Sequence, residues 1–148
     1  YLAISTISVK LSPNATDIVE IAKYAVDAGA DALTVANTYI GMAVDLKTRR
    51  PKLGNITGGL SGPAIKPLTM RLVYAIKKAI DIPIIASGGI MTAEDALEYL
   101  MIGASAVQVG TMNFTRPDIM VDIIEGIKEF MLNEKMQDIN DFIGSLSI

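Results

Sequence analysis

The chain has 148 residues, 51% of them apolar, and a formal net charge of −3. This length and apolar content predict a single domain over residues 1–148, and the acidic balance excludes a nucleic-acid-binding protein, which needs a basic face. The absence of Cys and His excludes thiol chemistry and a Ser-His dyad within these residues, and with no signal peptide or membrane-length apolar run of about 18 residues we expect a cytoplasmic protein.

Four short apolar runs alternate with helical patterns, which is typical of buried parallel strands in an α/β protein. The runs span residues 7–11, 32–36, 83–86 and 104–109. Helical patterns span residues 17–28, 92–102 and 115–132, and a further one begins near Pro67. Strand-helix units in series predict a parallel sheet, and such sheets bind ligands at the carboxyl ends of their strands.

Capping signals mark the ends of these helices. Thr92 and Asp95 predict a capping box, and Pro117 is expected at the first position of the last helix. Gly29 and Gly103 are expected to end two of the helices. These glycines begin two similar stretches, GADALTVAN and GASAVQVGT, so the chain repeats a helix stop followed by a buried strand.

Four strand-helix units are half of a TIM (β/α)8 barrel, which takes eight strands and about 250 residues. The chain also begins without Met, almost directly in a strand. We therefore expect the C-terminal half of such a barrel, present as a fragment or as one piece of a split chain. An open sheet of this kind would expose two edges and an apolar face, which predicts association with the missing N-terminal half or a homo-oligomer.

Two neighbouring strands are followed by glycine turns. Gly88 and Gly89 follow the third apolar run and precede the capped helix, and Gly110 and Thr111 follow the fourth run. Free N–H groups at the start of a helix bind anions, and glycine lets a ligand approach the backbone closely. A tight turn also uses glycine, but two adjacent turns of this kind favour a phosphate site.

The other two strand ends carry polar side chains. Lys10 either reaches solvent or places a fixed positive charge at the mouth of the sheet. Asn37 and Thr38 have the groups to bind a small polar heterocycle, although Asn also stabilises turns. The glycine-rich segment from Thr38 to Lys66 is too long for a plain connection, so we expect a lid or binding loop with Gly62 against the ligand.

Five motifs resemble those of the dihydroorotate dehydrogenases, flavin enzymes of pyrimidine synthesis, in order and approximate spacing. They are Val9-Lys10-Leu11-Ser12-Pro13-Asn14, Ala36-Asn37-Thr38, TGGLSGPAIKP at residues 57–67, Ser87-Gly88-Gly89-Ile90, and Val109-Gly110-Thr111-Met112-Asn113-Phe114. The form GGLSGPAIKP is most similar to the class 1B, NAD-linked catalytic subunit. The resemblance covers nearly the whole chain and implies the C-terminal half of that subunit.

The resemblance implies FMN as cofactor and oxidation of dihydroorotate to orotate. Lys10 looks like the family lysine that contacts the flavin ring near its N1 atom and C2 carbonyl, and Ala36 and Gly62 would border the FMN. The resemblance also implies that the FMN phosphate is bound by Gly88, Gly89, Gly110 and Thr111. It implies that dihydroorotate or orotate is bound by Asn37 and Thr38.

The chain departs from the family pattern in two places. The base of class 1 enzymes is a cysteine from the first half of the barrel, and this sequence has no cysteine. Ala86-Ser87 also stands where residues such as Gly-Met are more usual. We therefore expect no catalytic base and no metal site in this chain, and no turnover by the chain alone.

Two other hypotheses stay open from the sequence. One is a flavin-binding or phosphate-binding half-barrel without activity, and the other is an enzyme similar to dihydropyrimidine dehydrogenase, whose substrate has similar ring amides. A class 1B enzyme further implies a partner subunit with FAD and an iron–sulfur cluster as electron acceptor. Neither nucleic acid nor a membrane is an expected partner.

Overall fold

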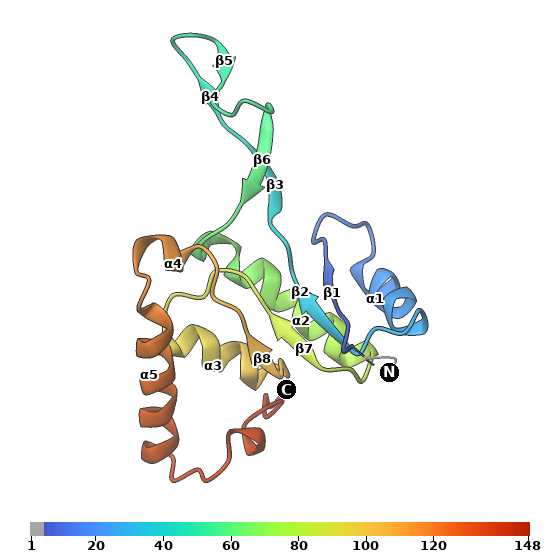
Figure 1. The fold of residues 1–148 in the computed structure, drawn as a ribbon, viewed down its shortest axis with the longest axis vertical. Helices are drawn as coiled ribbons and strands as arrows, with labels where there is room; N and C mark the ends of the chain where they lie inside the picture. Colours follow the sequence, from blue (N-terminus) through green and yellow to red (C-terminus); the bar gives the residue numbers. More distant parts are fainter. Residues whose placement is uncertain (1–4) are drawn as a thin grey trace.

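A four-stranded parallel sheet forms the centre of the structure, a computed structural model that describes residues 5–148 (Figure 1). The strands follow the order β1-β2-β7-β8 and comprise Ser8–Leu11, Ala32–Val35, Ile84–Ala86 and Ala106–Val107. Leu11 pairs with Val35, Val35 with Ala86, and Ala86 with Val107, so the four carboxyl ends lie in one row. The predicted α/β class and the four parallel strands are confirmed. β8 is shorter than the apolar run from residue 104 to 109 that predicted it.

Helices follow the strands at the positions that the sequence indicates. They are α1 (Ile18–Asp27), α2 (Lys66–Ala79), α3 (Ala93–Met101), α4 (Met112–Thr115) and α5 (Ile119–Asn133), with short 3-10 turns η1 (Pro63–Ile65) and η2 (Ile139–Asp141). None of the helices between residues 5 and 148 is long and apolar enough to cross a membrane.

The predicted helix ends are confirmed at three glycine or capping positions. Thr92 and Asp95 form the capping box of α3. Gly29 and Gly103 follow α1 and α3 with φ of +98° and +104°. In each case the glycine N–H bonds the carbonyl three residues earlier, and the next N–H bonds the carbonyl five residues earlier. Both repeats therefore end a helix with the same left-handed glycine.

The expected position of Pro117 was wrong. α5 begins at Ile119, and a separate one-turn helix, α4, precedes it. Arg116, the residue before the proline, is extended, with φ −137° and ψ 93°. A proline ring clashes with a helical conformation at the preceding residue, so the backbone leaves the helix at Arg116 before α5 starts.

The core lies between the sheet and the helices that cover one of its faces. Leu33, Val35, Ile84 and Ala86 of the sheet are fully buried, as are Val73 and Ile76 of α2 and Ala96 and Tyr99 of α3. The opposite face is more polar than expected, because alternation along the strands directs Ser8, Lys10 and Thr34 to it. The hydroxyls of Ser8 and Thr34 hydrogen-bond across this face at 3.0 Å.

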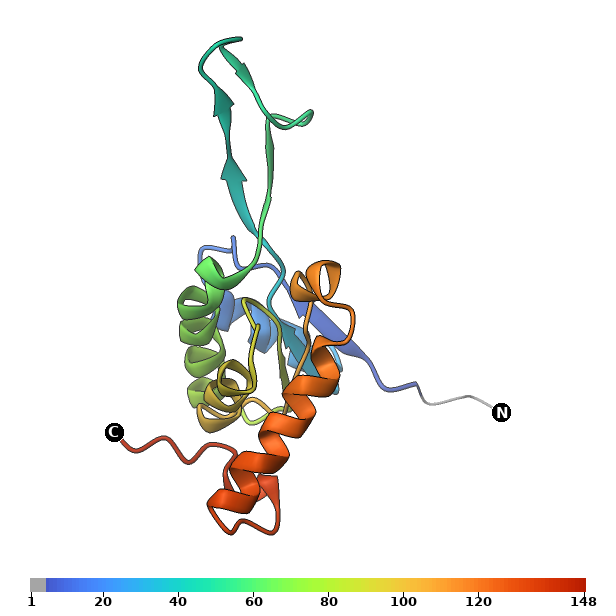
Figure 2. The ribbon, with the colours of Figure 1, turned by 90° about the vertical axis from the view of Figure 1, so that its left-hand side faces the viewer.

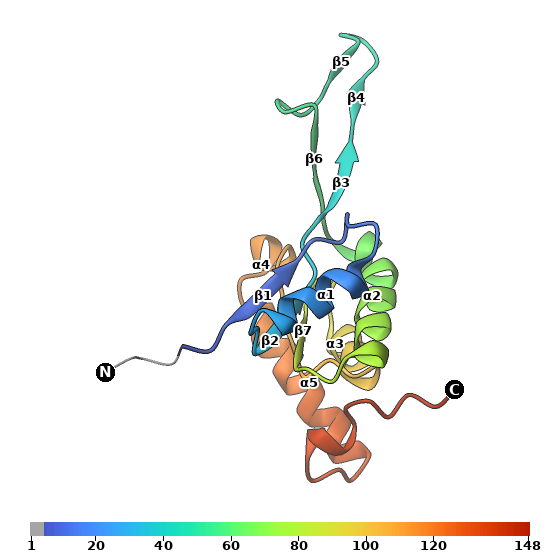
Figure 3. The same ribbon diagram turned by 90° about the vertical axis from the view of Figure 1, so that its right-hand side faces the viewer.

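The long segment between Thr38 and Lys66 is an ordered hairpin that projects from the body of the molecule (Figures 1, 2 and 3). β3 (Tyr39–Met42) pairs with β6 (Thr57–Leu60), and β4 (Val44–Asp45) pairs with β5 (Arg50–Pro51) farther out. The sequence predicted a functional loop here but not strands. Only the two ends of the segment approach the sheet, so the hairpin itself does not cover the strand ends as a lid would.

Candidate active site

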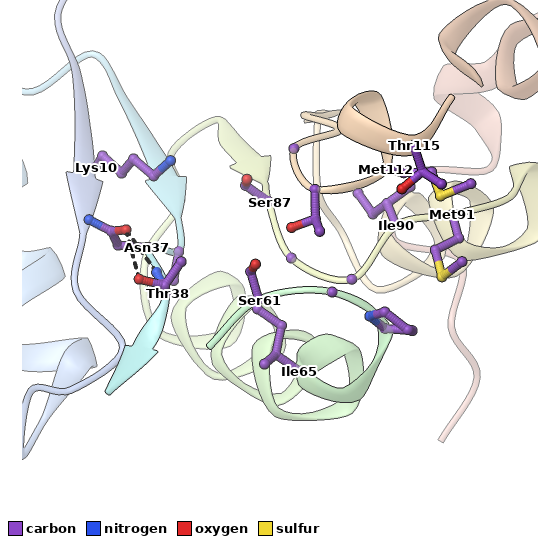
Figure 4. Close-up of a pocket in the computed structure, with 17 residues that line it drawn as sticks. Lys10, Asn37, Thr38, Ser61, Ile65, Ser87, Ile90, Met91, Met112 and Thr115 are labelled. Carbon is purple, nitrogen blue, oxygen red and sulfur yellow. Dashed lines mark hydrogen bonds between the residues drawn. The ribbon is translucent and has the colours of Figure 1, made fainter. Parts of the chain in front are cut away.

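A pocket of about 240 Å³ opens at the row of strand ends (Figure 4). All nine site residues predicted from the sequence line it: Lys10, Ala36, Asn37, Thr38, Gly62, Gly88, Gly89, Gly110 and Thr111. Figure 4 shows Lys10 and Asn37 at one side of the pocket, Met112 and Thr115 at the other, and Ser61 and Ser87 between them. The fold thus brings together residues that are up to 105 positions apart, from Lys10 to Thr115.

The turn after β7 presents unpaired backbone donors to this pocket. Within residues 5–148, no acceptor takes the N–H groups of Gly88, Gly89 or Ile90. The sequence also placed free donors at the start of α3, and there some of the amides are already bonded. The Asp95 carboxylate already accepts the amides of Met91 and Thr92 there, at 2.8 and 3.1 Å. The glycine turn therefore offers unpaired donors that line the pocket, whereas the Asp95 carboxylate occupies the two amides just before α3.

Different physical constraints apply at the glycine positions of the pocket. A Cβ at Gly88 would lie 2.7 Å from the Thr69 hydroxyl, and one at Gly89 would lie 2.7 to 2.9 Å from the Cβ and backbone of Lys66. Internal packing alone accounts for these two. At Gly110 nothing lies within 4 Å of the same position. The open space beside Gly110 is what close approach of a ligand requires, and no side chain of the described residues fills it.

Lys10 extends from β1 with its ammonium group towards the pocket (Figure 4). The ion pairs formed among residues 5–148 do not include it. Of the two alternatives left by the sequence, the structure thus shows the lysine at the pocket rather than turned away from it. A cation without a carboxylate partner is suited to attract an anionic group.

Asn37 and Thr38 follow β2, beyond the cis peptide bond between Val35 and Ala36. The Asn37 carboxamide oxygen accepts the Thr38 amide at 2.8 Å, so it stabilises the turn while its NH2 group has no partner among residues 5–148. Thr38 packs against Gly59 of β6, where a Cβ would collide with the threonine side chain. Asn14, which sequence reasoning did not single out, donates to the Thr38 carbonyl at 3.0 Å and accepts the Ile40 amide at 2.9 Å. Asn14 therefore fixes the base of the hairpin beside the pocket.

Gly62 lies where the hairpin returns to the sheet. Its φ of +92° is a conformation that side chains rarely adopt, and it precedes η1 at the edge of the pocket. A Cβ there would only touch Thr111 at 4.0 Å. Gly62 is required by backbone conformation rather than by lack of space.

A family model described as dihydroorotate dehydrogenase matches residues 3–131. The chain belongs to the dihydroorotate dehydrogenase family. It is 53% identical over 141 residues to the protein named dihydroorotate dehydrogenase B (NAD(+)), catalytic subunit, of Trichlorobacter lovleyi. The matched residues are 95% of this chain and 46% of that protein. The protein of the same name from Alkaliphilus metalliredigens is 53% identical over 138 residues, which are 93% of this chain and 46% of that protein. The one from Lachnoclostridium phytofermentans is 54% identical over 136 residues, which are 92% of this chain and 45% of that protein.

The predicted resemblance to the class 1B catalytic subunit is confirmed by these relatives. The chain spans about half the length of the curated relatives that it matches. The parallel sheet and its helices are consistent with part of the TIM barrel of a dihydroorotate dehydrogenase.

The site of this chain has features that fit FMN, the flavin that the family generally binds. Three unpaired amides of the glycine turn suit a phosphate, and the space beside Gly110 lets a ligand reach the backbone. Lys10 supplies a positive charge at the opposite side of the pocket. The residues present therefore fit a ligand with a phosphate at one end and an electron-rich group at the other.

A charged cluster beneath the glycine turn was missed by sequence reasoning. Lys66, at the start of α2, pairs with Asp95 and, at 2.7 Å, with Glu98. Burial favours the uncharged forms of both groups, but the hydrogen bonds to their charged forms have the larger combined effect. The pKa of Lys66 is therefore raised, and the pKa of Asp95 is lowered, from their ordinary values. Tyr99 is also buried here. In the sequence, the spacing of Asp95 and Tyr99 indicates only a capped helix with an apolar face, so it carries no signal for this cluster.

Proposed function

We propose that this chain supplies the FMN phosphate site and part of the substrate site of an enzyme that oxidises dihydroorotate to orotate in pyrimidine biosynthesis. The observation that carries the proposal is the single pocket at the strand ends that joins unpaired glycine-turn amides, the open backbone at Gly110 and Lys10. Family membership over residues 3–131 supports it.

In this proposal each side of the pocket has its own task. The amides of Gly88 and Gly89 bind the phosphate, with Gly110 and Thr111 beside them. Lys10 stabilises negative charge on the flavin ring, and Ala36 and Gly62 border it. FMN, when bound, accepts the hydride that dihydroorotate loses.

Asn37 and Thr38 are the proposed substrate contacts. Because the Asn37 oxygen already accepts the Thr38 amide while its NH2 group has no partner among residues 5–148, Asn37 acts in this proposal as a donor to a substrate carbonyl or carboxylate. The Thr38 hydroxyl can donate or accept and is held in place by its contact with Gly59.

The proton acceptor of the reaction is proposed to lie outside this chain. The sequence has neither Cys nor His, and none of the pocket residues is a carboxylate. We propose a cysteine from the other half of the barrel as the base. Further proposals are a homo-oligomer, an electron-transfer subunit with FAD and an iron–sulfur cluster, and a cytoplasmic location.

Flavin binding by the purified chain is the first test. Titration with FMN and with riboflavin, followed by quenching of flavin fluorescence, should give saturable binding that is markedly tighter for FMN, because only FMN carries the phosphate. Equal affinity for the two flavins, or no binding, would reject the phosphate site.

Activity is tested in a chimaera in which this chain replaces the matching 141-residue segment of the Trichlorobacter lovleyi subunit. We expect dihydroorotate, but not dihydrouracil, to bleach the flavin absorbance of the chimaera, and the chain alone to bleach with neither. Bleaching by dihydrouracil alone would favour a dihydropyrimidine dehydrogenase, and a flavin-loaded chimaera inert to both would favour a binding module.

A further inference from the structure

The Tyr99 hydroxyl lies directly under the glycine turn of the pocket. The side chain is fully buried, and its hydroxyl is 2.7 Å from the Gly88 carbonyl oxygen and 3.3 Å from the Lys66 carbonyl oxygen. A phenol has a single hydrogen, and the shorter distance assigns it to Gly88. α3 thus donates one buried hydrogen bond to the backbone of the turn.

This hydrogen bond sets the direction of the next amide. In a trans peptide the C=O and the following N–H point in opposite directions within one plane. Because the Gly88 carbonyl is directed down onto Tyr99, the Gly89 N–H is directed away from the core. Gly89 lines the pocket, and its N–H has no acceptor among residues 5–148.

A glycine-glycine peptide has little steric preference of its own for one orientation. Thr69 and Lys66 leave no room for side chains on Gly88 and Gly89, but steric contact alone does not distinguish the two directions of the peptide plane. The hydrogen bond to a fixed hydroxyl does distinguish them. Burial raises the pKa of Tyr99 well above its ordinary value, so the hydroxyl keeps its proton over the working range of the protein.

We propose that Tyr99 is a positioning residue for the phosphate site: its hydroxyl holds the Gly88 carbonyl on the core side of the turn, so that the Gly89 N–H faces the anion. The inference rests on the proposed FMN site and adds to it a residue that does not touch the ligand. Phenylalanine at this position keeps the aromatic packing and removes only the donor.

The test compares Tyr99→Phe with wild type in titrations with FMN and riboflavin. Loss of one buried hydrogen bond that orients one donor should weaken FMN binding about fivefold to tenfold and leave riboflavin binding within twofold. Tyr24→Phe is the matched control, since it removes an exposed tyrosine hydroxyl that bonds Glu20 on α1, far along the chain from the turn. Unchanged FMN affinity in Tyr99→Phe, or equal losses for both flavins, would overturn the positioning role.

Hydrogen exchange of the wild-type Gly89 amide tests the same geometry without a substitution, and it can contradict the proposal even if Tyr99→Phe does not fold. The amide should exchange rapidly in the free chain and become protected by FMN but not by riboflavin. Slow exchange in the free chain would contradict an N–H that faces the pocket. If wild type fails to bind FMN, the proposed function is rejected. If wild type and Tyr99→Phe bind FMN equally well, only the role of Tyr99 is rejected.

Discussion

Lys66 and Asp95 form a partly buried ion pair that joins the first turn of α2 to the capping box of α3. The second oxygen of Asp95 accepts the amides of Met91 and Thr92, so one carboxylate links two helices and the segment that follows the glycine turn. The glycine turn is therefore supported from below by Lys66 and Asp95, neither of which lines the pocket.

Asp95→Asn should lower the free energy of unfolding at pH 7 by about 2 kcal/mol, because it weakens a charged hydrogen-bond network and leaves Lys66 with Glu98 alone. The pKa of Asp95 is lowered in the folded state, so its contribution is present above the ordinary pKa of 3.8 and is lost as the pH falls through the folded value. The pKa of Lys66 is raised, so its contribution is present below 10.5 and is lost as the pH rises through the folded value.

Urea unfolding at pH 3, 7 and 9 checks this expectation. Wild type should lose more stability between pH 7 and pH 3 than Asp95→Asn does, and both should change little between pH 7 and pH 9. Asp81→Asn is the control, because Asp81 is fully exposed where it pairs with Lys77 and should matter little. The same acid dependence in wild type and Asp95→Asn would contradict the assignment.

Gly110→Ala and Gly88→Ala should separate ligand binding from folding. A Cβ at Gly110 meets nothing within 4 Å, so the melting temperature should stay within about 2 °C while FMN affinity falls about tenfold. A Cβ at Gly88 meets the Thr69 hydroxyl at 2.7 Å, so that variant should lose about 1–3 kcal/mol of stability. Thermal melts without ligand and flavin titrations measure both quantities, and a Gly110→Ala chain that binds FMN normally would show that FMN does not use the open space.

Lys10→Ala should leave the stability of the chain nearly unchanged, because the side chain is exposed and takes part in none of the ion pairs among residues 5–148. In the chimaera, kcat should fall about a hundredfold, the usual effect of removing a preorganised electrostatic group. Stopped-flow reduction of the flavin by dihydroorotate measures the rate, and Lys47→Ala on the hairpin serves as a charge-matched control. Equal rates for wild type and Lys10→Ala would exclude a role near the flavin.

Gly59→Ala should displace Thr38, because the added Cβ collides with the threonine side chain. We expect weaker binding of orotate to the chimaera, with a smaller effect on FMN because the glycine turn is untouched. Competition by orotate against dihydroorotate gives the inhibition constant. Gly54→Ala, where a Cβ meets nothing within 4 Å, is the matched control in the same hairpin. Normal orotate binding by Gly59→Ala would remove Thr38 from the substrate site.

Much of the fold could be predicted from local sequence patterns. Buried strands such as Ile84–Ala86 are continuous apolar runs, and the capping box at Thr92 and the glycines that end α1 and α3 act within a few residues. The site residues could be placed because parallel strands bring their carboxyl ends to one edge. These features depend on short-range chemistry or on topology alone.

The remaining features depend on contacts between distant segments. β6 contains Gly58 and Gly59, which are poor strand formers in isolation, and it becomes a strand only by pairing with β3. Tyr99 looks like any apolar residue on an amphipathic helix, and its hydroxyl gains a role only because Gly88 lies above it. That Asp95 accepts the amides of Met91 and Thr92, just before α3, could not be read from the sequence, although the capping box itself could.

The row of paired strand ends also fixes the span of the pocket. Neighbouring strands lie about 4.8 Å apart, so three steps from β1 to β8 separate their ends by at most about 14 Å. Backbone hydrogen bonds set this length, and changes in the surrounding loops cannot alter it. A ligand that contacts the ends of both β1 and β8 therefore has to extend across all four strands.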